Sequence, residues 1–149
     1  MSDPRELYQQ VILEHNKKPR NFGTLAPCTH HAEGHNPLCG DELDLTLIVE
    51  GDRVQDIKFR GTGCAIDVSS ASLMTGAVKG KTVTEALAMA EQFRGMVRGE
   101  LDPATEAPLL GKLILFAGVR DLPVRVKCAV LPWATLHAAL KGEAEASTE

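Results

Sequence analysis

The spacing of hydrophobic residues changes along the chain from helical to alternating, and then back to helical. Residues 7–16 carry apolar side chains at helical spacing, and Pro19 prevents this helix from continuing. Residues 42–50 alternate between apolar and polar side chains, which predicts a half-buried strand. A turn at residues 50–53 then leads into a second strand through Phe59, so the two strands form a hairpin.

The order of these patterns predicts the fold class. Helices are expected after the hairpin at about residues 66–79, 82–98, 109–117 and 124–140. Thr82 and Glu85 form a capping-box pattern at the start of one of them, and Pro132 must kink or restart the last. With a short strand near residues 30–33, we expect an α+β fold in which a small three-stranded antiparallel sheet packs against several helices.

Length and composition narrow the class of protein. The 149 residues predict one domain spanning 1–149, with a polar tail at about 142–149 that we expect to be disordered. The net charge of −4 argues against general binding to nucleic acid or to an anionic membrane. No apolar run approaches the ~20 residues that cross a bilayer, and the N-terminus lacks a signal-peptide pattern, so we expect a cytoplasmic protein.

The four cysteines, Cys28, Cys39, Cys64 and Cys128, are the main chemical signal. A cytosolic chain keeps its thiols reduced, so the free cysteines need burial or chemistry as an explanation. Cys39 lies in a loop directly before one strand of the hairpin, and Cys64 directly follows the other. Because hairpin strands place the start of the first beside the end of the second, Cys39, Asp41 and Cys64 should meet at one end of the sheet. Cys28 lies outside these segments, and we interpret it as an ordinary half-buried thiol.

These residue types favour a site for a soft metal ion. Thiolates of Cys39, Cys64 and Cys128 with the carboxylate of Asp41 would suit zinc, iron or copper(I). Cys64 precedes a helix, whose dipole lowers a thiol pKa. The sequence alone does not bring Cys128 to the others, and burial of each thiol as a small hydrophobe remains the alternative. Asp67 is interpreted as an acid of the first helical turn rather than a ligand.

Three segments resemble the IscU/NifU-type iron–sulfur cluster assembly family. They are Asn36-Pro37-Leu38-Cys39-Gly40-Asp41 before a strand, Gly61-Thr62-Gly63-Cys64 after a strand, and Cys128 in the final helical segment. The resemblance extends from the N-terminal helix to about Leu140. It implies an α+β fold in which Cys39, Asp41, Cys64 and Cys128 converge on one exposed site, with Gly40, Gly63 and Lys127 as supporting residues.

Two features resemble the SufU branch of that family: Lys127 replaces the histidine that precedes the third cysteine of scaffold members, and the chain is longer around residues 99–118. The SufU branch implies a zinc-bound protein that accepts sulfur from a SufS-type cysteine desulfurase and works with downstream iron–sulfur assembly or acceptor proteins. We expect Cys39 to be the sulfur acceptor, which makes the protein sulfurtransferase-like rather than a stand-alone enzyme. The alternative is a scaffold on which Cys39, Cys64 and Cys128 hold a transient [2Fe–2S] cluster.

Overall fold

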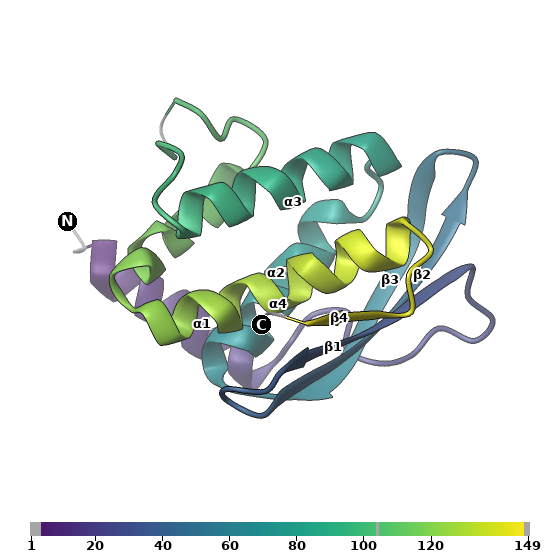
Figure 1. Ribbon diagram of the computed structural model, residues 1–149, viewed down its shortest axis with the longest axis horizontal. Helices are drawn as coiled ribbons and strands as arrows, with labels where there is room; N and C mark the ends of the chain where they lie inside the picture. The colour runs from purple at the N-terminus through teal and green to yellow at the C-terminus, as the bar shows by residue number, and fades with distance from the viewer. Residues whose placement is uncertain (1–3, 104, 148–149) are drawn as a thin grey trace.

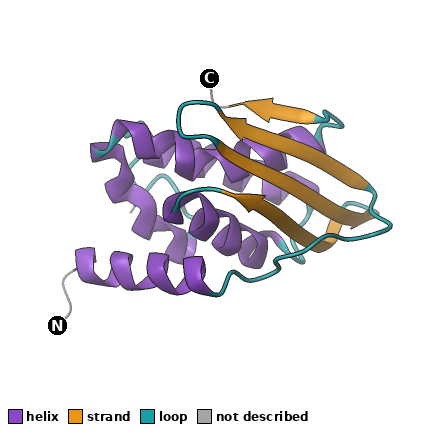
Figure 2. Cartoon of the chain, turned by 90° about the horizontal axis from the view of Figure 1, so that it is seen from below, coloured by secondary structure: helices purple, strands orange, loops and turns teal. Residues whose placement is uncertain are grey.

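A sheet of four strands forms one layer of the molecule, and the helices pack against one of its faces (Figures 1 and 2). This computed structural model describes residues 4–103 and 105–147. The strands are β1 (His30–Asn36), β2 (Asp41–Glu50), β3 (Arg53–Thr62) and β4 (Glu145–Ser147), in the order β3-β2-β1-β4. Neighbours are antiparallel except for β4, which runs parallel to β1. The α+β prediction is confirmed.

The C-terminal tail differs from our expectation in two ways. We expected a sheet of three strands and a disordered tail, but residues 145–147 of the tail form a fourth strand. Residues 145–147 pair with β1, and the backbone N–H of Glu33 donates to the carbonyl of Ala144 (2.8 Å). An unpaired strand edge offers a row of free backbone groups, and a tail that follows the last helix back along that edge can use them. The pattern of side chains does not reveal that this tail pairs with β1. Residues 148–149 of the tail lie outside the described residues.

Five helical segments follow the order that the sequence predicts. They are α1 (Pro4–Lys17), α2 (Ala65–Val78), α3 (Val83–Val97), the 3-10 helix η1 (Gly111–Asp121) and α4 (Pro123–Leu140). The capping box of Thr82 and Glu85 is confirmed at the start of α3. Pro132 does not divide α4, which is one helix on both sides of it; the missing N–H leaves the carbonyl of Cys128 without its usual donor. Within the described residues, no helix is both long and apolar enough to cross a membrane.

The core lies between the helices and the inner face of β2 and β3. In register, Leu45 pairs with Phe59 and Leu47 with Ile57, and all four side chains are buried. Burial of each side chain of this size stabilises the fold by roughly 1.5–3 kcal/mol relative to its exposed state. A one-residue slip in register would turn these side chains to the solvent-facing side and lose several such contributions. The hairpin register is therefore fixed, and it sets the end of β3 beside the start of β2, where the cysteine segments lie.

Candidate metal centre

The cysteines that lie far apart in sequence meet where the β1–β2 turn, the start of α2 and α4 come together. Cys39 is in the turn, Asp41 opens β2, Cys64 is the N-cap of α2, and Cys128 is in the second turn of α4. One ligand atom from each of Cys39, Asp41 and Cys128 lies within 4.8 Å of the others. The Sγ atoms of Cys39 and Cys128 are 3.7 Å apart.

Cys64 does not belong to this tight group but adjoins it. Its backbone N–H donates to Oδ1 of Asp41 (3.1 Å), and its thiol lies close enough to that of Cys128 for each to shift the pKa of the other. The hairpin predicted that Asp41 and Cys64 meet at one end of the sheet, and the structure shows a direct hydrogen bond between them. The structure also shows what the sequence could not, which is that α4 carries Cys128 to the same place.

The thiols differ in their access to solvent. Cys39 is exposed and Cys64 is half-buried, whereas Cys128 and Asp41 are buried. Cys28 is half-buried and is not a member of the group, as we expected. An incoming reactant therefore meets the sulfur of Cys39 first.

Hydrogen bonds distribute the protons between Cys64 and Cys128. The pKa of Cys64 falls to about 6, chiefly because the Cys128 thiol donates to it, and the amides of Asp67 and Ile66 at the start of α2 add to this. Burial and the charge of Asp41 oppose the shift. The pKa of Cys128 is raised because its proton is held by Cys64 and because burial disfavours its thiolate. Both shifts favour the thiolate of Cys64 over that of Cys128.

Asn36 is a buried residue of the site that our sequence reasoning missed. Its Nδ2 donates to Oδ2 of Asp41 (3.3 Å) and to Sγ of Cys128 (3.6 Å), so it links the carboxylate to the third thiol. Its Oδ1 is buried and has no partner within the described part of the chain. Its position at the start of the Asn36–Asp41 segment could have indicated that it contacts the site.

Arg125 places a positive charge beside the thiols. Its Nη1 lies 4.0 Å from Sγ of Cys128, and the two thiol groups of Cys128 and Cys64 raise its pKa. Lys127, which we expected to support the site, instead lines a separate hollow with Arg94. Spacing could have found Arg125, because residues three apart on a helix share a face and residue 125 is three before Cys128.

Asp67 lies much closer to the centre than its interpretation as a helix-terminal acid implied. Its side chain is buried, Oδ1 lacks a hydrogen-bond partner among the described residues, and its pKa rises to about 9 because of burial first and the charges of Asp41 and Cys64 second. The group is therefore a neutral acid at pH 7 and adds no charge to the site. A Cβ at Gly63 would overlap this carboxyl and lie 3.0 Å from Oδ1 of Asp41, so a larger residue there would force the Asp67 side chain to move.

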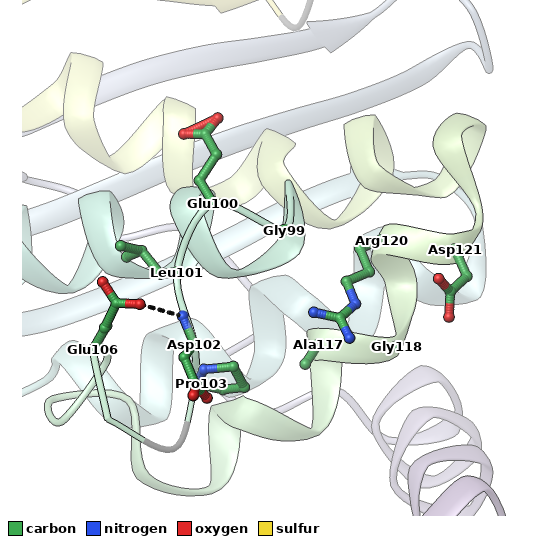
Figure 3. A pocket seen from close by; sticks show the side chains of 10 residues that line it. All are labelled: Gly99, Glu100, Leu101, Asp102, Pro103, Glu106, Ala117, Gly118, Arg120 and Asp121. Carbon is green, nitrogen blue, oxygen red and sulfur yellow. Dashed lines mark hydrogen bonds between the residues drawn. The ribbon is translucent and has the colours of Figure 1, made fainter.

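A hollow of about 570 Å³ lies elsewhere, between the end of α3 and η1 (Figure 3). Figure 3 shows that Arg120 and several carboxylate side chains line this hollow. Among them, Glu106 accepts a hydrogen bond from the backbone N–H of Asp102 (3.0 Å). The hollow is formed by the longer segment around residues 99–118. No residue of the thiol centre lines this hollow.

Comparison with known proteins identifies the family of the chain. A family model described as the NifU-like N-terminal domain matches residues 7–142. The chain belongs to this family. A Bacillus subtilis (strain 168) protein named zinc-dependent sulfurtransferase SufU is 44% identical over 132 residues, covering 88% of this chain and 87% of that protein. A Streptococcus pyogenes serotype M1 protein named iron–sulfur cluster assembly scaffold protein IscU is 41% identical over 146 residues, covering 98% and 90%.

Solved structures share the fold of this family member. A crystal structure from Fervidobacterium islandicum AW-1, titled as a scaffold protein for the SUF system, has a TM-score of 0.83 at 38% identity and covers 91% of this chain and 97% of its own. The N-terminal part of a NifU-like protein from Brucella abortus has a TM-score of 0.82 at 26% identity, with coverage of 92% and 94%. The arrangement of sheet and helices is therefore that of known family members.

The donor set of this family member fits a tetrahedral metal ion. Zinc binds thiolate sulfur at about 2.3 Å, which places two sulfurs of a tetrahedron about 3.8 Å apart. The 3.7 Å between the sulfurs of Cys39 and Cys128 matches that separation. Thiols with one carboxylate are also ligands that zinc and iron accept. Cys39, Asp41 and Cys128 would hold such an ion as they stand, and Cys64, which lies outside their group, would have to move closer to be the fourth ligand.

Proposed function

We propose that this protein accepts sulfur from a SufS-type cysteine desulfurase during iron–sulfur cluster assembly, and that Cys39 is the first acceptor. One observation carries the proposal: Cys39 is the exposed thiol of a group whose other thiols are buried or half-buried. A sulfur donor must reach an accessible sulfur atom. The similarity to a relative named as a zinc-dependent sulfurtransferase supports the same reading.

The transfer is a displacement at sulfur and needs no oxidant. The thiolate of Cys39 forms a bond to the outer sulfur of the persulfide on the desulfurase. The sulfur–sulfur bond of that persulfide breaks, and the desulfurase cysteine leaves as a thiolate. Cys39 then carries the extra sulfur as a persulfide, and the numbers of atoms and electrons are conserved.

The neighbouring residues would hold the acceptor ready for this step. A zinc ion bound by the four candidate ligands would keep the thiols deprotonated and ordered. Arg125 supplies positive charge beside sulfur anions, and Asn36 fixes Asp41 relative to Cys128. The left-handed backbone of Gly40 (φ +72°) forms the turn that presents Cys39. Downstream iron–sulfur assembly or acceptor proteins in the cytoplasm would receive the sulfur.

The test combines the protein with a SufS-type desulfurase and cysteine. We expect the wild-type protein to raise the rate of alanine formation, and mass spectrometry to find one added sulfur on the peptide that contains Cys39. Cys39→Ala should abolish both effects. Cys28→Ala is the matched control, since it removes a thiol outside the site, and should preserve both. Stimulation that persists in Cys39→Ala, with sulfur on another cysteine, would contradict the assignment of Cys39.

A cluster scaffold is the second candidate, and the similarity to relatives named IscU favours it. The three thiols and one carboxylate provide the four ligands that a [2Fe–2S] cluster requires. Reconstitution with iron and sulfide followed by visible absorption and iron analysis separates the candidates. A stable cluster in a protein that does not stimulate the desulfurase would overturn sulfur acceptance in favour of the scaffold.

A further inference from the structure

The outer face of the sheet, away from the helices, carries a row of histidine and carboxylate side chains. His31, Glu33 and His35 alternate along β1 with buried inward-facing residues, so they share the outer face. The strand register places Asp44 of β2 opposite Glu33 on one side and Glu145 of β4 opposite it on the other. Figure 2 shows this face with the β strands in orange.

The side chains of this row approach each other closely. Ligand atoms of His31, Glu33 and Asp44 all lie within 4.8 Å of one another, and those of Glu33, His35 and Glu145 do the same. Nε2 of His31 is in direct contact with Oδ1 of Asp44. Two groups of candidate ligands therefore share Glu33 at their centre.

The row also borders a concave part of the surface. A hollow of about 610 Å³ is lined by Glu33, His35 and Asp44 on the sheet and by Phe22 and Thr24 from the segment before β1. That segment is fastened across the outer face, because the backbone N–H of residue 25 donates to the buried Thr46 hydroxyl of β2 (3.0 Å). Glu33 and Asp44 therefore border this open hollow, whereas His31 lies on the same face of the sheet without lining it.

The charges of the row are unfavourable without a cation. Glu145, Glu33 and Asp44 lie side by side on three strands, and like charges directly opposite on neighbouring strands destabilise a sheet. Arg60 of β3 pairs in register with Asp44. Across residues 4–103 and 105–147, however, no ion pair joins Arg60 to these carboxylates, and none involves Glu33 or Glu145. A divalent cation would relieve this repulsion.

We propose that His31, Glu33 and Asp44 bind one divalent transition-metal ion of the zinc class, at a site separate from the thiols. One imidazole nitrogen and two carboxylate oxygens are ligands that zinc accepts, and three protein ligands leave a position for water. This group is favoured over the one with Glu145 because β1 and β2 are long paired strands, whereas β4 has three residues.

The site shares no ligand with the thiol centre. On β1, His35 faces outward and the next residue, Asn36, faces inward to hold Asp41 and Cys128. An ion held by His31, Glu33 and Asp44 would join β1 to β2 on the outer face, with Glu33 three residues before Asn36 along β1. The two centres are therefore separated by the sheet itself.

The test counts zinc ions retained by the full chain against a competing chromophoric chelator. We expect His31→Gln and, independently, Glu33→Gln to lose one equivalent of zinc relative to the wild type. His30→Gln is the matched control, because residue 30 is the adjacent histidine on the strand and lies outside both ligand groups; it should lose none. Only the difference between proteins is used, so the result does not depend on whether the thiols also bind zinc.

Cobalt(II) adds a readout that separates the two centres. Cobalt bound by thiolate gives intense charge-transfer absorption, whereas cobalt bound by nitrogen and oxygen gives weak bands alone. His31→Gln should remove the weak bands of one equivalent and leave any thiolate absorption intact, with circular dichroism confirming the fold. Equal zinc retention in wild type and His31→Gln would overturn the proposal, as would binding of an adventitious ion only, seen at large excess of zinc. Loss in His35→Gln but not in His31→Gln would overturn the choice of ligands.

Discussion

At the scale of single residues, the thiol centre depends on neighbours that are neither thiols nor motif glycines. Asn36 bridges Asp41 and Cys128, and Arg125 faces the Cys128 sulfur. The pKa of Cys64 is lowered both by its own helix and by a residue that is distant in sequence. The start of α2 predicted a lowered pKa, and the structure shows that hydrogen bonding from Cys128, a residue on another helix, lowers it more.

Gly63→Ala tests the close approach of two carboxyl groups to the backbone. The new methyl group would overlap the carboxyl of Asp67 and press on Asp41, so both side chains must move. By analogy with other residues that orient metal ligands, we expect zinc affinity of the thiol centre to fall about 10- to 100-fold. Chelator competition measures the change.

Gly76→Ala provides the control within the same helix. A methyl group there meets no atom within 4 Å, and alanine favours a helix over glycine by about 1 kcal/mol. We expect this variant to be more stable to urea and to bind zinc as the wild type does. Equal zinc affinity in both glycine variants would show that the space at Gly63 does not position the ligands.

At the scale of elements, the β2–β3 hairpin and the helices on either side of it position the chemistry. The alternating pattern of β2 predicted the hairpin, and the register Glu42 with Thr62 sets the two cysteine segments side by side. The strand β4 was not predicted, because three residues with Ala146 as the one apolar side chain are too few to show an alternating pattern. It forms because the edge of β1 is free and α4 delivers the tail there.

Thr82→Ala tests the capping box that begins α3. The Thr82 hydroxyl accepts from the backbone N–H of Glu85 (3.1 Å), and the Glu85 carboxylate accepts from Thr82 N–H in return (3.3 Å). Loss of a cap of this kind lowers the free energy of unfolding by about 1 kcal/mol. Urea denaturation should show a lower midpoint with an unchanged slope. Thr82→Ser keeps the hydroxyl and should restore most of the stability; if it behaves like the alanine variant, the cap is not the cause.

At the scale of the whole molecule, α1 and the loop after it are fastened to α2 by polar contacts. Nδ1 of His15 lies 2.6 Å from the Ser72 hydroxyl, which also accepts from the backbone N–H of Arg20 (2.8 Å). Partial burial lowers the pKa of His15, and the charge of Arg20 lowers it further. The neutral imidazole is thus the form that fits the folded protein.

This arrangement predicts how stability responds to acid. The unfolded chain binds a proton on His15 at about pH 6.5, whereas the folded protein binds it only at lower pH. The contribution of His15 is therefore complete above that pH and is lost as the pH falls through the folded pKa. His15→Gln, which stays neutral, should lose less stability than the wild type between pH 7 and about 5 in urea titrations. Identical pH slopes in both proteins would exclude this role for His15.

The sequence by itself determined the α+β class, the hairpin and the meeting of Asp41 with Cys64, because strand alternation and turn residues act over short distances along the chain. It also pointed to Cys39 as a thiol held in a loop. Only the tertiary structure decided that Cys128 joins them, that Arg125 faces the thiols, and that Asp67 is a buried acid with a raised pKa. Those outcomes depend on how α2 and α4 pack against the sheet, and packing between distant segments leaves no periodic trace in the sequence.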